Sequence, residues 1–325
     1  MALRPGKDIL YLSRADILGL SITPAEINAS VEAAFVAKAT GRAYIKPKIV
    51  ITRPDGVSFL AKAAALAEPS YGSIKWLVNV PGNSTKGLPD FLPIILLNEG
   101  ETGMPVAVME AAWITEVRTG SMTAICARHM ARPESQCIGF IACGTQARGN
   151  LNTLRAVLPL AEVTAYSRSF ATAEAFAGWA REQGLTARAV HDPKDAITGM
   201  DVVVTSTPHM TLKESFLDPA WVSPGTFVSM VDLGFSWHRQ GMSAFERIVA
   251  DDVEQAGPGG TEKLNFDGPF AADIAEIVAL QKPGRQSSTE RNALITSGIG
   301  LADTGPAALV YERAIARGVG TVLPL

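Results

Sequence analysis

Residues 137–147, Cys-Ile-Gly-Phe-Ile-Ala-Cys-Gly-Thr-Gln-Ala, combine an apolar run, a turn of small residues and the start of a helical pattern. Such a turn can bind a pyrophosphate, because residues without bulky side chains let backbone N–H groups reach the phosphate oxygens and the helix dipole favours their charge. Small residues occupy the three positions of the dinucleotide pattern, Ala142, Gly144 and Ala147, although the first is usually glycine. We therefore expect dinucleotide binding here, the alternative being an ordinary strand-to-helix turn.

A second apolar run, Glu162–Tyr166, ends in Ser167-Arg168-Ser169. This is where a dinucleotide-binding fold contacts the adenosine ribose. An acidic residue there would bind the two ribose hydroxyls of NAD, whereas serine and arginine suit a 2′-phosphate. The sequence therefore predicts that NADP(H) is preferred and NAD(H) is possible. The alternative is a tight turn with a solvated Arg168.

Four cations occupy positions from which they could bind a substrate carboxylate. Lys46 and Lys48 flank Pro47 at the start of a β run, Lys75 lies inside an apolar β run, and Arg118 lies near the first turn of a helical pattern. Arginine binds a carboxylate through two parallel hydrogen bonds, and lysine binds it as a point charge. The alternative is that these cations lie at the surface with their aliphatic stems on apolar neighbours.

Asp232 follows the β run Phe227–Met230, so we expect it at the carboxyl end of a strand, where open α/β sheets bind ligands. A carboxylate there can accept hydrogen bonds from a substrate ammonium or exchange a proton with an imine nitrogen. Asp232 and Lys75 are our candidate catalytic residues. The alternative for Asp232 is that it caps the following turn.

The pattern of elements changes at Pro133. Before it, short β runs separated by Gly, Pro and Asn prevail, with one helix expected behind Thr23-Pro24 and another over about residues 115–130. After it, β runs and helical patterns alternate, which predicts a parallel sheet with right-handed crossovers. The expected strands lie at residues 9–12, 49–52, 73–80, 91–97, 105–109, 136–141, 162–166, 186–190, 202–205, 226–230 and 247–250.

A chain of 325 residues exceeds the usual size of one domain. We therefore expect an α/β protein with two domains. Residues 133–296 are expected to form a Rossmann-type, doubly wound parallel sheet that binds the dinucleotide. Residues 1–132 and 297–325 are expected to form a second α/β domain for substrate binding and dimerisation, because the last thirty or so residues carry a helical pattern that returns to the first part of the chain.

Composition argues against several classes of function. A net charge of −3 and the lack of a stretch that mixes Lys and Arg with aromatic residues argue against nucleic-acid binding. No apolar run reaches the eighteen or so residues of a membrane span, and the N-terminus lacks the apolar core of a signal peptide, so we expect a cytoplasmic protein without membrane contact. Three cysteines and four histidines without metal-ligand spacing predict reduced thiols and no metal site.

Six segments, spread in order over nearly the whole chain, carry a family resemblance: Gly72–Lys75, Thr102–Glu110, Ile114–Thr115, Arg118–Thr119, Gly139–Ala147, and Gly298–Asp303 with Tyr311. Together they resemble the ornithine cyclodeaminase/mu-crystallin family. Within it, residues 74–76, 81–83, 108–111 and 318–321 most resemble the branch of amino-acid and imine dehydrogenases. The resemblance implies a Rossmann domain and an α/β domain that forms a homodimer through its strands. It also implies a nicotinamide that exchanges hydride with the α-carbon of a small amino or imino acid.

The resemblance assigns roles to several of the candidate residues. A cation from the Lys46/Lys48 segment, with Lys75 and Arg118, would bind the substrate α-carboxylate, and Asp232 would face its nitrogen. The sequence departs from the family pattern at the first of these positions, which is commonly arginine. The candidate cofactor-binding residues are Thr119, Gly144, Thr145, Gln146, Ala147, Ser167, Arg168, Ser169, Thr207, Asp232 and Gly298.

Two further features bear on the substrate. Members with cyclodeaminase activity usually carry a Gly-Asp-Cys-Pro-Gly-Lys run around the aspartate, and the sequence Val-Asp-Leu-Gly-Phe at residues 231–235 lacks it. This argues against ornithine cyclodeaminase itself. Lys62 is a further cation that either meets a second acid group of the substrate or lies at the surface.

We therefore expect an NAD(P)-dependent oxidoreductase that acts on the CH–NH or C=N group of amino or imino acids. One alternative is a redox-neutral cyclodeaminase-type lyase that releases ammonia. Another is a non-catalytic protein that binds a nucleotide or other ligand, which would not need Lys75, Arg118 and Asp232 together.

Overall fold

The computed structural model describes residues 3–208, 214–256 and 264–325, and the chain divides into two compact units. Unit 1 consists of Met1–Arg118 and Ile299–Leu325, and unit 2 of Thr119–Gly298. The division falls inside helix α3 (Ala112–Met130), whereas the sequence suggested a boundary at Pro133. Because α3 is one continuous helix, its residues up to Arg118 belong to unit 1 and those from Thr119 onwards to unit 2.

Unit 1 contains a mixed sheet of eight strands. Neighbouring strands are antiparallel except for one parallel pair, β1 with β7. The order is β16-β1-β7-β6-β5-β4-β2, and β3 also pairs with β4. The strands are β1 (Asp8–Leu12), β2 (Ala43–Ile45), β3 (Ile49–Thr52), β4 (Ser58–Leu66), β5 (Tyr71–Asn79), β6 (Phe91–Glu99), β7 (Pro105–Glu110) and β16 (Thr321–Pro324).

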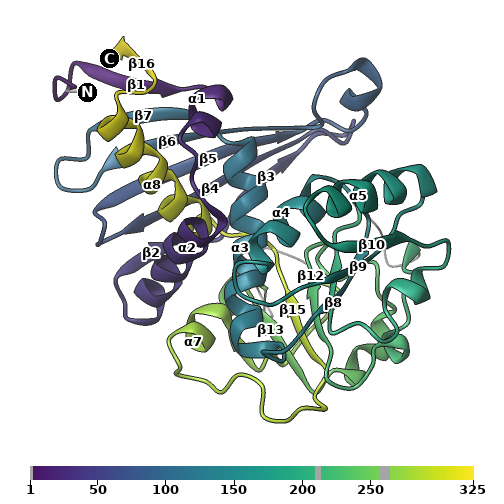
Figure 1. Ribbon diagram of the computed structural model, residues 1–325. Coiled ribbons are helices and arrows are strands. Elements are labelled where there is room, and N and C mark those ends of the chain that lie inside the picture. Colours follow the sequence, from purple (N-terminus) through teal and green to yellow (C-terminus); the bar gives the residue numbers. More distant parts are fainter. Residues whose placement is uncertain (1–2, 209–213, 257–263) are drawn as a thin grey trace. The chain divides into compact units, whose positions relative to one another are not determined.

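Helices α1 (Arg14–Gly19), α2 (Pro24–Ala39) and α8 (Leu301–Arg317) complete unit 1. The predicted start of α2 is confirmed. Thr23 caps it by accepting a hydrogen bond from the Glu26 N–H, and the Glu26 carboxylate accepts one from the Thr23 N–H. Figure 1 shows α8 lying across the sheet, and it contacts β4, β5 and β6.

The two faces of this sheet differ in burial. Residues that pair directly across neighbouring strands point to the same side, so Lys62, Lys75 and Ile95 share one face and Trp76 shares the other with Ile94. The first face is buried, because Ile95 has no exposed surface. On the second face Ile94 is 50% exposed and Trp76 38% exposed.

Unit 2 contains a second sheet of eight strands, all parallel, in the order β10-β9-β8-β11-β12-β15-β13-β14. The order reverses between β8 and β11, as in a doubly wound fold. The predicted Rossmann-type fold class is therefore confirmed. The strands are β8 (Cys137–Ile141), β9 (Glu162–Tyr166), β10 (Thr186–Ala189), β11 (Val202–Thr205), β12 (Phe227–Met230), β13 (Arg247–Ala250), β14 (Ala272–Asp273) and β15 (Asn292–Ile295).

The strands at the centre of unit 2 are fully buried, as expected for a parallel sheet covered on both faces. Its helices, besides the rest of α3, are α4 (Thr145–Leu154), α5 (Phe170–Glu182), α6 (Val253–Ala256) and α7 (Ile274–Val278). Among the helices of the described residues, none is long and apolar enough to cross a membrane.

Candidate active site

The predicted dinucleotide turn connects β8 to α4 at the edge where the strands of unit 2 end. Ala142 has a φ of 70°, in the left-handed region that glycine adopts most readily. This conformation explains why glycine is usual at this position, and alanine adopts it here. Ala142 donates its backbone N–H to Tyr166 at the end of β9, and its carbonyl accepts from the Ser206 hydroxyl behind β11. The turn is thus fixed to both neighbouring strands.

Gly144, the N-cap of α4, has the surroundings of a ligand-binding glycine. Its φ of −86° is open to any residue, and a Cβ at this position would meet no atom of the described chain within 4 Å. Packing therefore does not require glycine here, but close approach of a phosphate would. Gly144 also has no side chain that could accept a hydrogen bond from the first N–H groups of α4, so these groups are suited to binding an anion. Thr145 beside it is exposed, Gln146 is half-buried and Ala147 is buried.

The segment behind β9 is open to a ligand. Arg168 and Ser169 are exposed and Ser167 is half-buried. Ser169 is the N-cap of α5, but within the described chain its hydroxyl does not cap that helix by a hydrogen bond. The structure thus leaves these polar groups available at the end of the strand next to the dinucleotide turn.

Asp232 lies behind β12, at the same edge of the sheet. Its Oδ1 accepts a hydrogen bond from the Thr205 hydroxyl at 3.0 Å, and its Oδ2 accepts one from the Thr207 hydroxyl at 2.8 Å. Burial raises the pKa of Asp232, although the hydrogen bonds that the carboxylate accepts oppose this shift. The two threonines belong to the neighbouring strand end, so they orient the carboxylate firmly. Leu233 and Gly234, which follow it, both adopt positive φ angles of 60° and 78°.

Gly298 is held at this edge by a residue that the sequence analysis missed. Asp251, directly behind β13, is fully buried and accepts backbone hydrogen bonds from Ser297 at 3.0 Å and from Gly298 at 2.6 Å. The sequence carries one signal for it, an aspartate directly after an apolar β run, which is the same signal that identified Asp232. Thr119 in α3 is also buried.

In unit 1, Lys75 lies at the centre of a cluster of buried charges. Its side chain has no exposed surface, and its Nζ donates a hydrogen bond to Asp303 Oδ1 at 2.6 Å and one to the Thr115 hydroxyl at 3.3 Å. Arg118 lies beside it, with Nε 3.1 Å from the same Asp303 oxygen. A single carboxylate therefore holds two of the predicted carboxylate-binding cations in place.

Arg118 keeps donors that this pairing does not use. Its Nε is close to Asp303 but not aligned for a hydrogen bond, and its buried Nη1 has no hydrogen-bond partner among the described residues. A buried guanidinium normally has its N–H groups paired. These donors are the feature of the cluster that most directly suggests an anionic ligand.

Asp303 is placed by the start of α8. It lies in the first turn of that helix, where the helix dipole favours a negative charge. The start of α8 lies close to β4, because a Cβ at Gly300 would come within 2.8 Å of the Ala63 carbonyl carbon. In the sequence, Asp303 stands in a segment that resembles the family, but no local pattern indicates its role.

Lys46 and Lys48, which flank Pro47, have different environments. Lys48 is buried, with 9% of its surface exposed, whereas Lys46 is exposed. In a regular strand, residues two apart would share a face. Here β2 ends at Ile45 and β3 begins at Ile49, so the strand edge is interrupted at Pro47 and the two lysines separate. The surface alternative therefore applies to Lys46 and not to Lys48, Lys75 or Arg118.

Lys62 is also part of this cluster, so the alternative of a surface position for it is wrong. It is only 5% exposed and pairs directly opposite Lys75 in the β4/β5 register. Ile49, which follows Lys48, pairs with Ala61, so Lys48 lies beside Lys62 on the next strand. The three lysines form a row from Lys48, directly before β3, across β4 and β5.

The charges of this cluster change one another's pKa values. Burial, followed by the Arg118 charge, lowers the pKa of Lys75 to about 8, although Asp303 opposes the shift. Burial and the charges of Arg118, Lys75 and Lys48 hold the pKa of Lys62 well below its ordinary value. Burial alone would raise the pKa of Asp303, but the charges of Lys75 and Arg118 hold it below its usual value. A bound anion would favour the charged forms of Lys62 and Lys75, so the cluster is suited to binding one.

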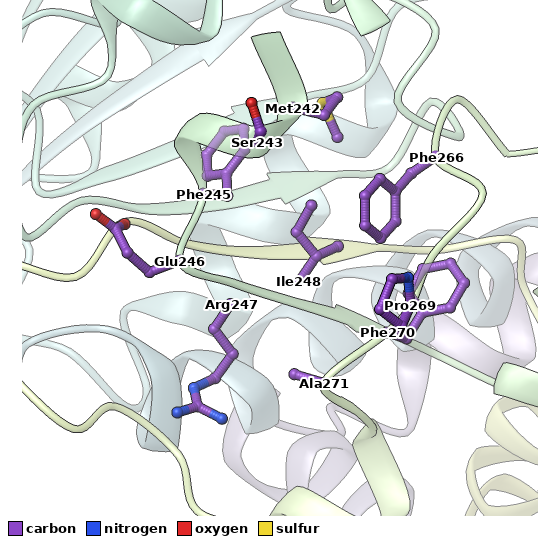
Figure 2. A pocket seen from close by; sticks show the side chains of 10 residues that line it. All are labelled: Met242, Ser243, Phe245, Glu246, Arg247, Ile248, Phe266, Pro269, Phe270 and Ala271. Carbon is purple, nitrogen blue, oxygen red and sulfur yellow. The ribbon is translucent and has the colours of Figure 1, made fainter. Parts of the chain in front are cut away.

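A cavity of about 210 Å³ lies elsewhere in unit 2, at the beginning of β13. Figure 2 shows Phe245, Phe266, Phe270 and Ile248 around it, while the charged ends of Glu246 and Arg247 are turned away from these rings. Its lining is mostly apolar, and it adjoins the amino end of the strand. Ligands of open α/β sheets bind at the carboxyl end, so we do not assign the dinucleotide to this cavity.

Residues 10–318 match the ornithine cyclodeaminase/mu-crystallin family. The chain belongs to this family. The resemblance stated from the sequence is thereby confirmed, and the match includes the segments of both units described above.

Among relatives in the family, an alanine dehydrogenase of Archaeoglobus fulgidus is 32% identical over 323 residues, which cover 97% of this chain and 98% of that protein. The solved structure of an archaeal alanine dehydrogenase dimer with bound NAD superposes with a TM-score of 0.86 at 30% identity, covering 97% and 99% of the two chains. The Δ1-pyrroline-2-carboxylate reductase of Thermococcus litoralis, in complex with NADH and L-proline, has a TM-score of 0.87 at 28% identity, covering 96% and 99%.

Proposed function

We propose that this protein is an NAD(P)-dependent oxidoreductase that acts at the α-carbon of an amino or imino acid. The observation that carries the proposal is the buried cation cluster of unit 1, in which Lys75 and Arg118 share one carboxylate and Arg118 keeps unpaired donors. The relatives of 28–32% identity are dehydrogenases and a reductase of amino or imino acids, which supports this function over a redox-neutral lyase or a passive carrier.

In this function, unit 1 binds the α-carboxylate. Arg118 donates its free N–H groups, Lys75 adds a point charge, and Lys48 is the third cation. Asp303 keeps Lys75 and Arg118 oriented before the substrate arrives, which lowers the entropic cost of binding. Lys75, whose pKa is about 8, is also placed to exchange a proton near neutral pH.

In this function, unit 2 binds the dinucleotide and exchanges a proton with the substrate nitrogen. Gly144, Thr145 and the first turn of α4 would hold the pyrophosphate. When bound, the nicotinamide supplies or accepts the hydride that is exchanged at the substrate α-carbon. Asp232 gives a proton to the substrate nitrogen or takes one from it, and its raised pKa brings this exchange closer to neutral pH.

The experiment that tests the function is an assay at 340 nm with NADPH and NADH. The purified chain is offered cyclic imino acids, and 2-oxo acids paired with ammonium or amines. Net consumption of either reduced dinucleotide supports the proposal. Ammonia release from an amino acid with NAD present, without any absorbance change, would instead establish the lyase.

We further propose that NADP(H) is preferred, because Arg168 and Ser169 are exposed behind β9, where a 2′-phosphate would bind. Arg168→Ala is expected to raise the KM for NADPH about tenfold or more and to leave the KM for NADH nearly unchanged, since only NADPH carries the phosphate. Arg155→Ala, which removes an exposed arginine at the end of α4, serves as the control. Equal effects of Arg168→Ala on both dinucleotides would contradict this preference.

Carboxylate binding should depend on the protonation of Lys75. Because its pKa is about 8, the ammonium form that attracts a carboxylate is lost as the pH rises through that value. The affinity for propionate, whose charge is constant from pH 6.5 to 10, is expected to fall by up to about tenfold per pH unit above pH 8. Titration calorimetry in the presence of NADP measures it. An affinity that stays constant from pH 7 to 9.5 would remove Lys75 from the carboxylate site.

We also propose a homodimer formed through the exposed face of the first sheet. Apolar residues line this face on neighbouring strands, and a large exposed apolar patch usually marks an interface. They include Ile49 and Ile51 on β3, Ile74 and Trp76 on β5, and Leu92 and Ile94 on β6. The archaeal alanine dehydrogenase of similar fold is a dimer. Sedimentation at twice the chain mass of 34.4 kDa would support the proposal, and a monomer would refute it.

A cytoplasmic location is part of the proposal as well. The described cysteines, Cys126, Cys137 and Cys143, are all free thiols, as expected in a reducing compartment. Alkylation of the three thiols in unfolded protein taken directly from cells would support it, and protection of any of them by a disulfide would argue against it.

A further inference from the structure

The buried cation cluster contains more basic side chains than one substrate carboxylate needs. Lys48, Lys62, Lys75 and Arg118 are each at most 9% exposed, and Asp303 is the carboxylate that acts on both Lys62 and Lys75. Asp303 pairs with Lys75 and Arg118. Buried charges are normally paired, because an isolated one is costly to keep out of water.

Lys62 is the cation whose charge the protein itself leaves uncompensated. Within the described chain, no carboxylate lies within ion-pair distance of its ammonium group, and the charged groups that act on it are Arg118, Lys75 and Lys48, with Asp303 opposing them. A hydrocarbon side chain at this position would pack on the sheet without this cost. The presence of lysine is therefore better explained by a ligand than by folding stability.

The position of Lys62 separates it from the groups that Asp303 orders. It lies on β4, directly opposite Lys75 on β5, at a Cα separation of about 5 Å. Lys75 and Arg118 both contact Asp303, which lies on α8. Lys62 lies on the other side of Lys75, between it and Lys48. An anion bound by Lys75 and Arg118 would thus have a second cation close by, on the next strand.

We propose that Lys62 binds a second carboxylate, carried by the side chain of the substrate, so that the preferred substrates are dicarboxylic amino or imino acids of four or five carbons. This inference rests on the proposed function and specifies its substrate class. Binding of the second carboxylate would also restore the ammonium form of Lys62, which its ligand-free surroundings disfavour.

The test compares Lys62→Met with the wild type on paired substrates. The substrates are oxaloacetate and 2-oxoglutarate, each with ammonium, against pyruvate with ammonium. We expect the wild type to prefer a dicarboxylate, and Lys62→Met to lower the ratio of dicarboxylate to monocarboxylate kcat/KM by about 30-fold, as for loss of a charged hydrogen bond. Lys86→Met, which removes an exposed lysine of the same unit, should leave the ratio unchanged.

A binding measurement makes the test independent of turnover. Succinate, glutarate and propionate are titrated into wild type and Lys62→Met by calorimetry, and thermal unfolding is followed with and without succinate. The variant should fold, because it loses a buried charge among like charges, and its Tm without ligand should equal or exceed that of the wild type. The stabilisation by succinate should disappear, while that by propionate remains.

The outcomes separate this inference from the proposed function. If the wild type reduces monocarboxylic imines and dicarboxylic ones no better, the function stands and the inference fails. If Lys62→Met weakens propionate and succinate equally, Lys62 belongs to the α-carboxylate site and the inference is again wrong. If no imine is reduced at all but succinate binds through Lys62, the proposed reaction fails while the assignment of the second carboxylate site holds.

Discussion

Asp232→Asn is expected to lower kcat by about 10²- to 10⁴-fold, the usual contribution of a positioned acid or base. The amide keeps the shape of the side chain and can still accept a hydrogen bond from Thr205 or Thr207, but it cannot exchange a proton with the substrate nitrogen. Dinucleotide affinity, measured by fluorescence titration with NADPH, should change little, because the turn at Gly144 is untouched. The loss therefore should appear in kcat.

The pH profile separates a chemical role of Asp232 from a merely structural one. In the wild type, kcat/KM should depend on an ionising group whose pKa lies above the usual range of an aspartate, since burial raises it. Asp232→Asn should lose this dependence. Asp195→Asn, an exposed aspartate of the same unit, is the matched control and should retain full activity. Retained turnover in Asp232→Asn would remove Asp232 from the mechanism.

Arg118→Ala is expected to raise the substrate KM by about 10²- to 10³-fold, since two charged hydrogen bonds to the carboxylate are lost. Its Nη1 is buried without a partner in the described structure, so the donor is available before substrate arrives. The effect on kcat should be smaller, because the guanidinium holds the carboxylate in the ground state and the transition state alike. Steady-state kinetics with the best substrate of the assay panel measure both constants.

Two comparisons make the Arg118 result interpretable. Arg128→Ala removes an exposed arginine from the same helix and should leave KM unchanged. Arg118→Lys keeps the charge but not the bidentate geometry, and it should recover part of the affinity. An Arg118→Ala enzyme with normal KM and reduced kcat would contradict carboxylate binding by Arg118 and indicate a role for it in the chemical step.

The sequence by itself determined the features that depend on neighbouring residues. The strand-turn-helix at residues 137–147, the position of Asp232 behind a strand and the Thr23 cap of α2 all follow from local patterns of burial and hydrogen bonding. The alternation of β runs and helices was enough to predict the parallel sheet of unit 2, since each parallel connection requires a crossover. The motif segments were enough to identify the family.

Local patterns did not predict the structure where a strand is interrupted or where its sequence lacks the residues typical of strands. The strand β4 was not predicted, because its alanine-rich sequence lacks the β-branched residues that mark strands. For the same reason the surroundings of Lys62 could not be assigned. The sequence also could not distinguish Lys46 from Lys48, because the break between β2 and β3 depends on how both pair with β4.

Only the tertiary structure decided how the charges of the site are combined. Lys75 and Asp303 are 228 positions apart, and no spacing in the chain relates them. Their contact exists because α8 packs on strands β4, β5 and β6 of the first sheet, with Gly300 allowing the helix start to approach β4. The pKa values of Lys62 and Lys75 depend on burial and on charges from separate segments of the chain, which include α3, α8 and the residue before β3. Such long-range electrostatics arise from packing, which a local sequence pattern does not specify.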